Sequence, residues 1–209
     1  MRNKIILDQL RAKEKQIEQL VCNRIEQTGN NIQKEFYQRW KDHNRNEAIE
    51  TMFYDLRQNV MDYWLNEKYT KGSTTAFNLL YLEQDGLYGG EFTSFAIDFR
   101  YPSKKLPQFE ILDDRFHYIE NRNNLPACVI PLLDVLTQEI QGKEYDFEDW
   151  DDVMDLYALF EVTAYIDTHH TLLLAHQEQL FQSLPIQKPF YLAVGEHDAG
   201  APQLIYVIE

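Results

Sequence analysis

The chain has 209 residues, of which 44% are apolar and 13% aromatic, and its 34 acidic and 20 basic side chains give a net charge of −14. This length suits one domain with a full hydrophobic core, and the scarcity of Gly and Pro excludes collagen-like, linker-like and low-complexity chains. The acid excess disfavours binding to nucleic acid or anionic lipid, because phosphate contacts need Lys and Arg.

The first third of the chain has the apolar spacing of helices. Apolar residues recur at helical intervals over 4–28, over 32–40 and over about 47–68. Gly29, followed by two Asn residues, is a stop signal between the first two of these segments. We therefore expect residues 1–72 to form a helical layer.

After residue 72 the pattern changes to strands separated by helices. A strand over 74–83, a turn rich in Asp and Gly, and an alternating return strand over 92–101 predict a hairpin. Residues 190–194 and 204–208 predict a second hairpin around a turn that contains Gly195 and Gly200. Between the hairpins the pattern indicates a short strand at 109–112 and helices over 128–141 and 150–182.

This order of elements predicts an α+β fold. The helical N-terminal layer packs on an antiparallel sheet built from two hairpins, with a long helix between them. We expect one domain over 1–209, in which residues 1–72 are helical and residues 73–209 form an acidic α+β region. No apolar run is long enough to span a membrane, no secretory signal is visible, and two distant cysteines form no disulfide framework, so we expect a cytoplasmic protein.

The negative charge is concentrated in the acidic α+β region. Residues 1–72 hold 13 bases and 11 acids, whereas residues 73–209 hold 7 bases and 23 acids. A field of this sign attracts a basic protein and speeds encounter with it, although an acidic surface also serves solubility alone. The sequence does not indicate the oligomeric state.

The sharpest local feature is a run of seven acids within twelve residues, interleaved with aromatic side chains. Acids at a helix N-terminus favour the positive end of the helix dipole, which accounts for two or three of them. The remainder fits a docking patch in which acids steer a basic partner and aromatics supply anchoring area. The predicted partner-binding residues are Glu144, Tyr145, Asp146, Phe147, Glu148, Asp149, Trp150, Asp151, Asp152 and Asp155.

The histidines supply the alternative, enzymatic interpretation. Asp167 and His170 have Asp-x-x-His spacing on a predicted helix, and the segment that ends at His117 has the same spacing. Such pairs build di-metal centres in helical bundles, so a metal-dependent hydrolase or oxidase could use Asp167, His170 and His117. A second acid–base candidate is Glu196-His197-Asp198, although neighbouring side chains on a strand point to opposite faces.

Motifs for common cofactors and nucleophiles are absent from the sequence. It contains no phosphate-binding loop, no dinucleotide-binding glycine motif and no nucleophile elbow. We therefore expect no cofactor and no catalytic residue in the leading interpretation. A third interpretation is a scaffold protein that self-associates through its N-terminal helices.

In overall character the chain resembles the bacterial immunity proteins that neutralise polymorphic or contact-dependent toxins. The acidic–aromatic run at 144–155 and the acid excess of 73–209 carry this resemblance. It implies a small non-enzymatic protein that occludes the active site of a basic toxin, in many cases a nuclease. The partner would then be a cognate toxin, with no nucleic acid or membrane bound directly.

Overall fold

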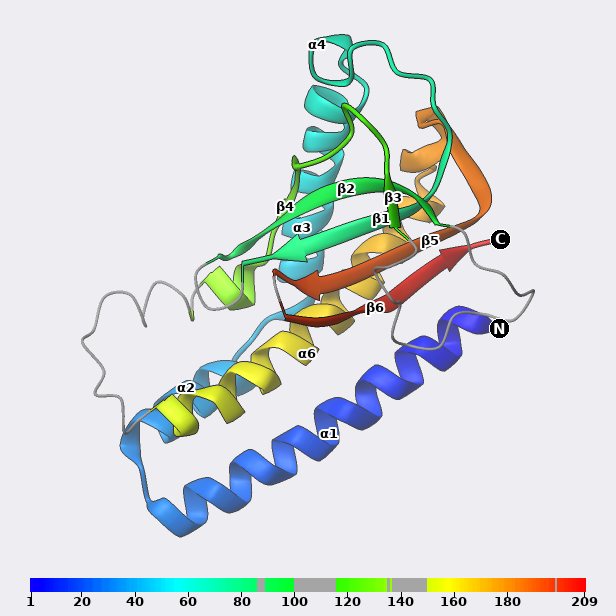
Figure 1. The fold of residues 1–209 in the computed structure, drawn as a ribbon. Coiled ribbons are helices and arrows are strands. Elements are labelled where there is room, and N and C mark those ends of the chain that lie inside the picture. The colour runs from blue at the N-terminus through cyan, green and yellow to red at the C-terminus, as the bar shows by residue number, and fades with distance from the viewer. Residues whose placement is uncertain (86–88, 100–115, 135, 137–149, 198) are drawn as a thin grey trace.

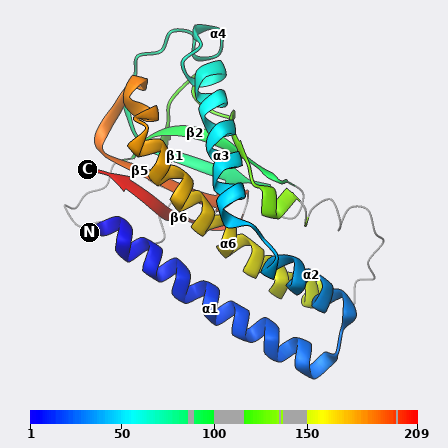
Figure 2. The same ribbon diagram turned by 180° about the vertical axis from the view of Figure 1, so that it is seen from behind.

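The fold is that of a computed structural model, which describes residues 1–85, 89–99, 116–134, 136, 150–197 and 199–209. Helices and a mixed six-stranded sheet make it an α+β fold, as predicted. Helices α3 (Arg45–Asn59) and α6 (Trp150–Gln177) lie behind the sheet in Figure 1 and in front of it in Figure 2, so they cover one face of it, whereas α1 (Arg2–Thr28) runs below the sheet in both views. Helices α1 (Arg2–Thr28) and α6 (Trp150–Gln177) contact each other and the edge strand β6 (Ala199–Ile208).

The N-terminal helices begin and end at the residues that supply their caps. The C-cap of α1 is Gly29, in the left-handed conformation that glycine accepts most easily, with φ 67°. The side chain of Asn30 then accepts hydrogen bonds from the first amides of α2 (Asn31–Lys41), and Asn44 caps α3 (Arg45–Asn59). The predicted helix over 47–68 is therefore three elements: α3, a π-helical turn η1 (Val60–Trp64) and the short α4 (Glu67–Thr70).

The predicted hairpins are present, but the sheet is not wholly antiparallel. Strand β1 (Phe77–Gln84) pairs antiparallel with β2 (Glu91–Phe99), and β5 (Ile186–Glu196) pairs antiparallel with β6. The two hairpins join through β1 and β5, which run parallel. The reason is the connection through α6, which returns the chain to the end of the sheet at which β1 begins, so that Phe77 N donates to Pro185 O at 3.0 Å.

Two short strands were not predicted. Strands β3 (Phe116–Tyr118) and β4 (Leu125–Val129) both pair with β2. The sequence placed the start of the helix over 128–141 three residues before the observed start. Its first two residues belong to β4, and the helical backbone begins at residue 131. The predicted strand at 109–112 lies outside the described residues.

The long helix ends earlier than its apolar pattern suggested. α6 stops at Gln177, and residue Gln179 takes a left-handed conformation with φ 60° before the 3-10 helix η5 (Leu180–Ser183).

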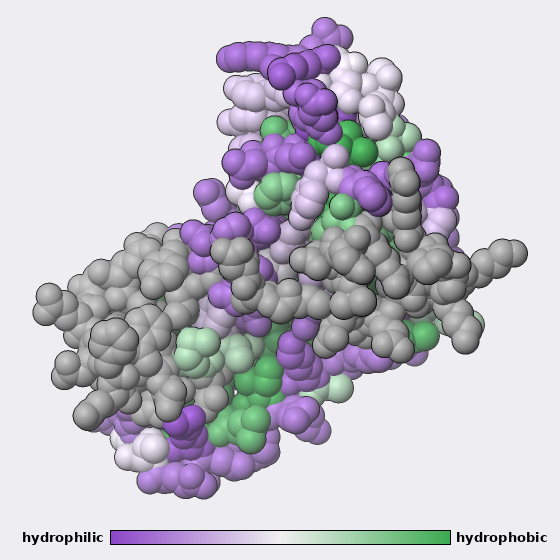
Figure 3. Space-filling view, in the orientation of Figure 1, coloured by the Kyte–Doolittle hydropathy of each residue, from purple (hydrophilic) through white to green (hydrophobic). Residues whose placement is uncertain are grey.

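In the view of Figure 1, hydrophilic residues cover the end of the molecule around α4 and the rim along α1 (Figure 3). The hydrophobic core draws on both the N-terminal helices and the acidic α+β region, from Ile6 in α1 to Ile208 in β6.

A close packing contact explains Gly90, which the sequence pattern assigns to a turn. Neither Gly89 nor Gly90 has a positive φ. A Cβ on Gly90 would lie 2.5 Å from the Cα of Asp134, whereas a Cβ on Gly89 would approach the side chain of Asp85 at 3.1 Å. Gly90 also accepts a 2.6 Å hydrogen bond from Ile130 N, so β2 and the segment after β4 approach each other closely there.

Candidate functional site

The C-terminal ends of the parallel strands β1 and β5 place polar side chains beneath α6. Gln84 and Glu196 are register partners at these ends, where the two arrowheads lie side by side in Figure 1. Partners in adjacent strands share a face of the sheet, and Gln84 bonds to α6, so both belong to the face that the helices cover. Crevices at the carboxyl ends of parallel strands are common binding positions in α/β sheets.

Helix α6 presents a matching stripe to these strand ends. Tyr157, Glu161 and Tyr165 follow one another at intervals of four residues, so they lie on one face of the helix. Gln84 Nε2 donates to Glu161 Oε1 and to the Tyr165 hydroxyl, each at 3.1 Å. The Tyr165 hydroxyl donates to the same Glu161 oxygen at 2.7 Å. We call Gln84, Tyr157, Glu161, Tyr165 and Glu196 the Glu161–Glu196 cluster.

Two polar atoms of this cluster are buried without a partner. Six buried side-chain atoms in the described residues lack a hydrogen bond, and two of them are Gln84 Oε1 and the Tyr157 hydroxyl. Gln84 is 1% exposed and Tyr157 4% exposed. Buried polar groups normally have hydrogen-bond partners, so two unpartnered polar atoms in one cluster are unusual. A ligand group that binds at the cluster would explain them.

The electrostatics of the cluster are those of an uncompensated negative site. Burial raises the pKa of the Glu196 carboxyl, and the charges of Glu161 and Asp85 raise it further. Burial also raises the pKa of the Tyr157 hydroxyl, with contributions from Glu161 and Glu196. The charges of both carboxylates therefore act on the Tyr157 hydroxyl, and a bound cation would reduce the repulsion between Glu161 and Glu196.

The predicted acid–base triplet is divided by the structure. Glu196 belongs to the cluster, whereas His197 Nδ1 lies 3.0 Å from Glu83 Oε1 and its side chain is 55% exposed. Asp198 lies outside the described residues. Neighbouring side chains on a strand point to opposite faces, and the separation of Glu196 from His197 is consistent with that geometry.

The predicted docking run lies almost entirely beyond what the structure describes. Residues 144–149 are outside the described residues. Trp150, Asp151, Asp152 and Asp155 form the first turns of α6, and only their backbone is described. Tyr157 follows Asp155 by two residues, so the Glu161–Glu196 cluster continues the same helix from the end of the acidic run.

Of the predicted metal-binding residues, Asp167 has a different partner from the one expected. Its Oδ2 lies 2.6 Å from Nε2 of His43, a residue of the α2–α3 connection, and its buried Oδ1 has no partner. His170 is close enough to Asp167 for the carboxylate to oppose the lowering of its pKa by burial. His117 lies on β3, at the opposite edge of the sheet from β6. No three His, Cys, Asp or Glu side chains among the described residues are placed to hold a metal ion.

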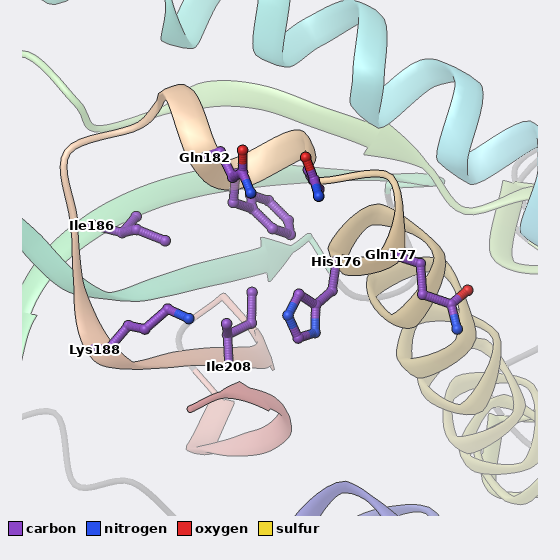
Figure 4. Close-up of a pocket in the computed structure, with 8 residues that line it drawn as sticks. His176, Gln177, Gln182, Ile186, Lys188 and Ile208 are labelled. Atoms are coloured by element: carbon purple, nitrogen blue, oxygen red, sulfur yellow. The ribbon is translucent and has the colours of Figure 1, made fainter.

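One cavity elsewhere on the protein has a lysine and a histidine that already have partners. A cavity of about 190 Å³ lies beside the end of α6, where Lys188 extends toward Ile208 and His176 with Gln182 opposite (Figure 4). Lys188 Nζ donates to the backbone oxygen of Glu209 at 2.8 Å, and His176 Nδ1 lies 3.2 Å from the Tyr206 hydroxyl. None of the six orphan atoms belongs to a residue that lines this cavity.

Sequence reasoning considered Glu196 only as part of an acid–base triplet with His197 and Asp198, and it missed the other four members of the cluster. The available signal was the four-residue spacing of Tyr157, Glu161 and Tyr165, which places a carboxylate between two tyrosines on one helix face. That spacing carries no information about which strand the face meets.

Comparison with known proteins gives no match: no family model fits the chain, and no curated protein or solved structure is significantly similar to it. Within the stretches of the chain that the structure describes, no helix has the length and apolarity needed to cross a membrane.

Proposed function

We propose that this protein is a non-enzymatic, immunity-type binding protein of the cytoplasm that neutralises a basic toxin by occluding its active site. A nuclease is the leading class of partner, because its active site holds the Lys and Arg that contact substrate phosphates. Acidic side chains of this protein would pair with those cations in place of the phosphates.

The observation that carries the proposal is the Glu161–Glu196 cluster. Its carboxylates repel each other and its buried acceptors lack donors. A free protein that maintains such a site loses stability by it, which is typical of sites kept for binding. The acidic run that precedes Tyr157 in the chain extends the same negative character along the start of α6.

The charge of the chain supports a protein partner over other ligands. Residues 73–209 contribute 23 acids against 7 bases, and all members of the cluster belong to this region. Complementary charge raises the association rate and the specificity of such a complex more than its affinity. No described arrangement of side chains favours the metal-dependent alternative in the same way.

Association kinetics test the docking role of the acidic run. A basic partner, captured from the native host at low salt and then purified, is mixed with the wild type and with a variant in which Asp146, Glu148, Asp149, Asp151 and Asp152 become Asn or Gln. We expect the variant to associate more slowly and to show a flatter dependence of rate on salt, because electrostatic steering is lost. Unchanged kinetics would remove the run from the interface.

A further inference from the structure

The Glu161–Glu196 cluster contains more hydrogen-bond acceptors than donors. Its amide donor, Gln84 Nε2, already serves two acceptors, and the Tyr165 hydroxyl donates to Glu161. Two carboxylate groups, the orphan Gln84 Oε1 and the unpartnered Tyr157 oxygen remain as acceptors. The only unused donor of the five side chains is the Tyr157 hydroxyl. The cluster therefore lacks a group that brings several N–H donors together with positive charge.

Among common cationic groups, a guanidinium fits this deficit best. It carries five N–H donors in a rigid plane and bonds a carboxylate through two of them, whereas an ammonium has three donors and acts as a point charge. A metal ion is the poorer match, because the described residues include no group of three potential ligands placed around one point. A guanidinium is also weakly hydrated, so it loses less when it enters a half-buried site.

The two carboxylates of the cluster are more exposed than the residues that carry its orphan groups. Glu161 and Glu196 are partly exposed, whereas Gln84 and Tyr157 are buried. An arriving cation would first encounter the two carboxylates, and the Tyr157 hydroxyl and Gln84 Oε1 would complete its coordination. Hydrogen bonds to buried partners of this kind confer specificity for the donor geometry, while the carboxylates supply most of the attraction.

We infer that the Glu161–Glu196 cluster is a socket for one arginine side chain of the basic partner. This inference rests on the proposed function, since it names the group that the partner inserts. Glu161 and Glu196 bind the guanidinium, the Tyr157 hydroxyl and Gln84 Oε1 accept from its remaining N–H groups, and Tyr165 with Gln84 Nε2 holds Glu161 in place.

The socket is tested with a single amino-acid probe and the full chain. N-acetyl-arginine amide, N-acetyl-lysine amide and the uncharged isostere N-acetyl-citrulline amide are titrated at neutral pH, and the side-chain amide signals of Gln84 are followed by NMR. We expect saturable shifts with the arginine amide, with a Kd on the order of 1 mM for so small a ligand, and a Kd at least about tenfold weaker for the lysine amide. The citrulline amide should leave the signals unchanged.

Matched variants separate the socket from general electrostatics. Glu196→Gln and Glu161→Gln should each weaken the arginine amide at least about tenfold. Glu50→Gln, which removes the same charge from an exposed position on α3, should leave the affinity unchanged. Equal responses to the arginine and lysine amides, or undiminished binding by Glu196→Gln, would overturn the inference. The binding would then be a nonspecific attraction of cations to a negative surface.

The same variants distinguish a wrong socket from a wrong function. If a purified basic partner binds wild type, Glu161→Gln and Glu196→Gln equally, the docking function stands and the socket is wrong. If the arginine amide binds as expected but no basic partner is neutralised, the socket stands and the proposed function fails.

Discussion

The unpartnered hydroxyl of Tyr157 makes an unusual prediction about stability. Tyr157→Phe removes a buried polar atom that has no hydrogen bond in the free protein, and it leaves the packed ring in place. An unsatisfied buried polar group costs about 1–3 kcal/mol, so we expect this variant to raise the free energy of unfolding by about 1 kcal/mol. For a chain of this length that corresponds to a rise in Tm of about 2–4 °C.

Tyr165→Phe is the matched control two turns along the same helix. It removes a hydroxyl that donates to Glu161 at 2.7 Å and accepts from Gln84 at 3.1 Å. Each such bond is worth about 1 kcal/mol net, so we expect a loss of about 2 kcal/mol and a fall in Tm of about 4–8 °C.

Thermal unfolding followed by circular dichroism measures both changes, and urea unfolding checks that the m-value is constant. The two substitutions remove the same atom from the same residue type, so opposite signs can arise only from the partners of that atom. A fall in Tm for Tyr157→Phe similar to that for Tyr165→Phe would refute the reasoning, because the Tyr157 hydroxyl would then be satisfied in solution. Stabilisation by Tyr157→Phe should accompany weaker binding of the basic partner.

Three further predictions concern other contacts. Glu196→Gln should stabilise the free protein at neutral pH, and this advantage should disappear in acid. The pKa of Glu196 in the folded protein lies above its ordinary value of 4.5, so the wild type loses stability as the pH rises from 4.5 through the folded-state pKa. The free energies of unfolding of the two proteins, measured as a function of pH, should therefore converge below pH 4.5. Gly90→Ala should cost about 1–3 kcal/mol because backbone atoms must move, whereas Gly89→Ala, facing a side chain, should cost less; denaturant unfolding of both compares them. Arg122→Met should lower the free energy of unfolding by about 2 kcal/mol in the same assay, since Arg122 donates to two backbone carbonyls, those of Trp64 at 2.9 Å and Ser73 at 2.8 Å.

Local sequence signals predicted the elements well where capping or periodicity determined them. The stop at Gly29 and the helix that follows it are present because a left-handed glycine and an Asn cap are local devices. The alternation in 92–101 likewise marks β2, whose sides face different environments. The parallel pairing of β1 with β5 depends on a connection of 101 residues, from 85 to 185, so no local pattern could predict it.

The candidate site shows the same division between local and long-range information. The spacing of Asp167 and His170 placed both on one helix, but the hydrogen-bond partner of Asp167 is His43, 124 residues away in the chain. Gln84 joins Glu161 across 77 residues, in a pairing fixed by how α6 crosses the sheet. The sequence predicted the helix that carries Tyr157, Glu161 and Tyr165, whereas the orphan acceptors depend on how that helix packs on the strand ends.

Neutralisation of a basic partner is the central claim, and stoichiometric inhibition tests it most directly. The basic protein captured at low salt is purified, its enzymatic activity is measured, and this protein is added in increasing molar ratio. We expect the activity to fall linearly and to be abolished at one equivalent of the wild type. One equivalent of the Glu161→Gln/Glu196→Gln double variant should not abolish the activity, whereas one equivalent of Glu50→Gln should. Undiminished activity of a bound partner at several equivalents would contradict the claim.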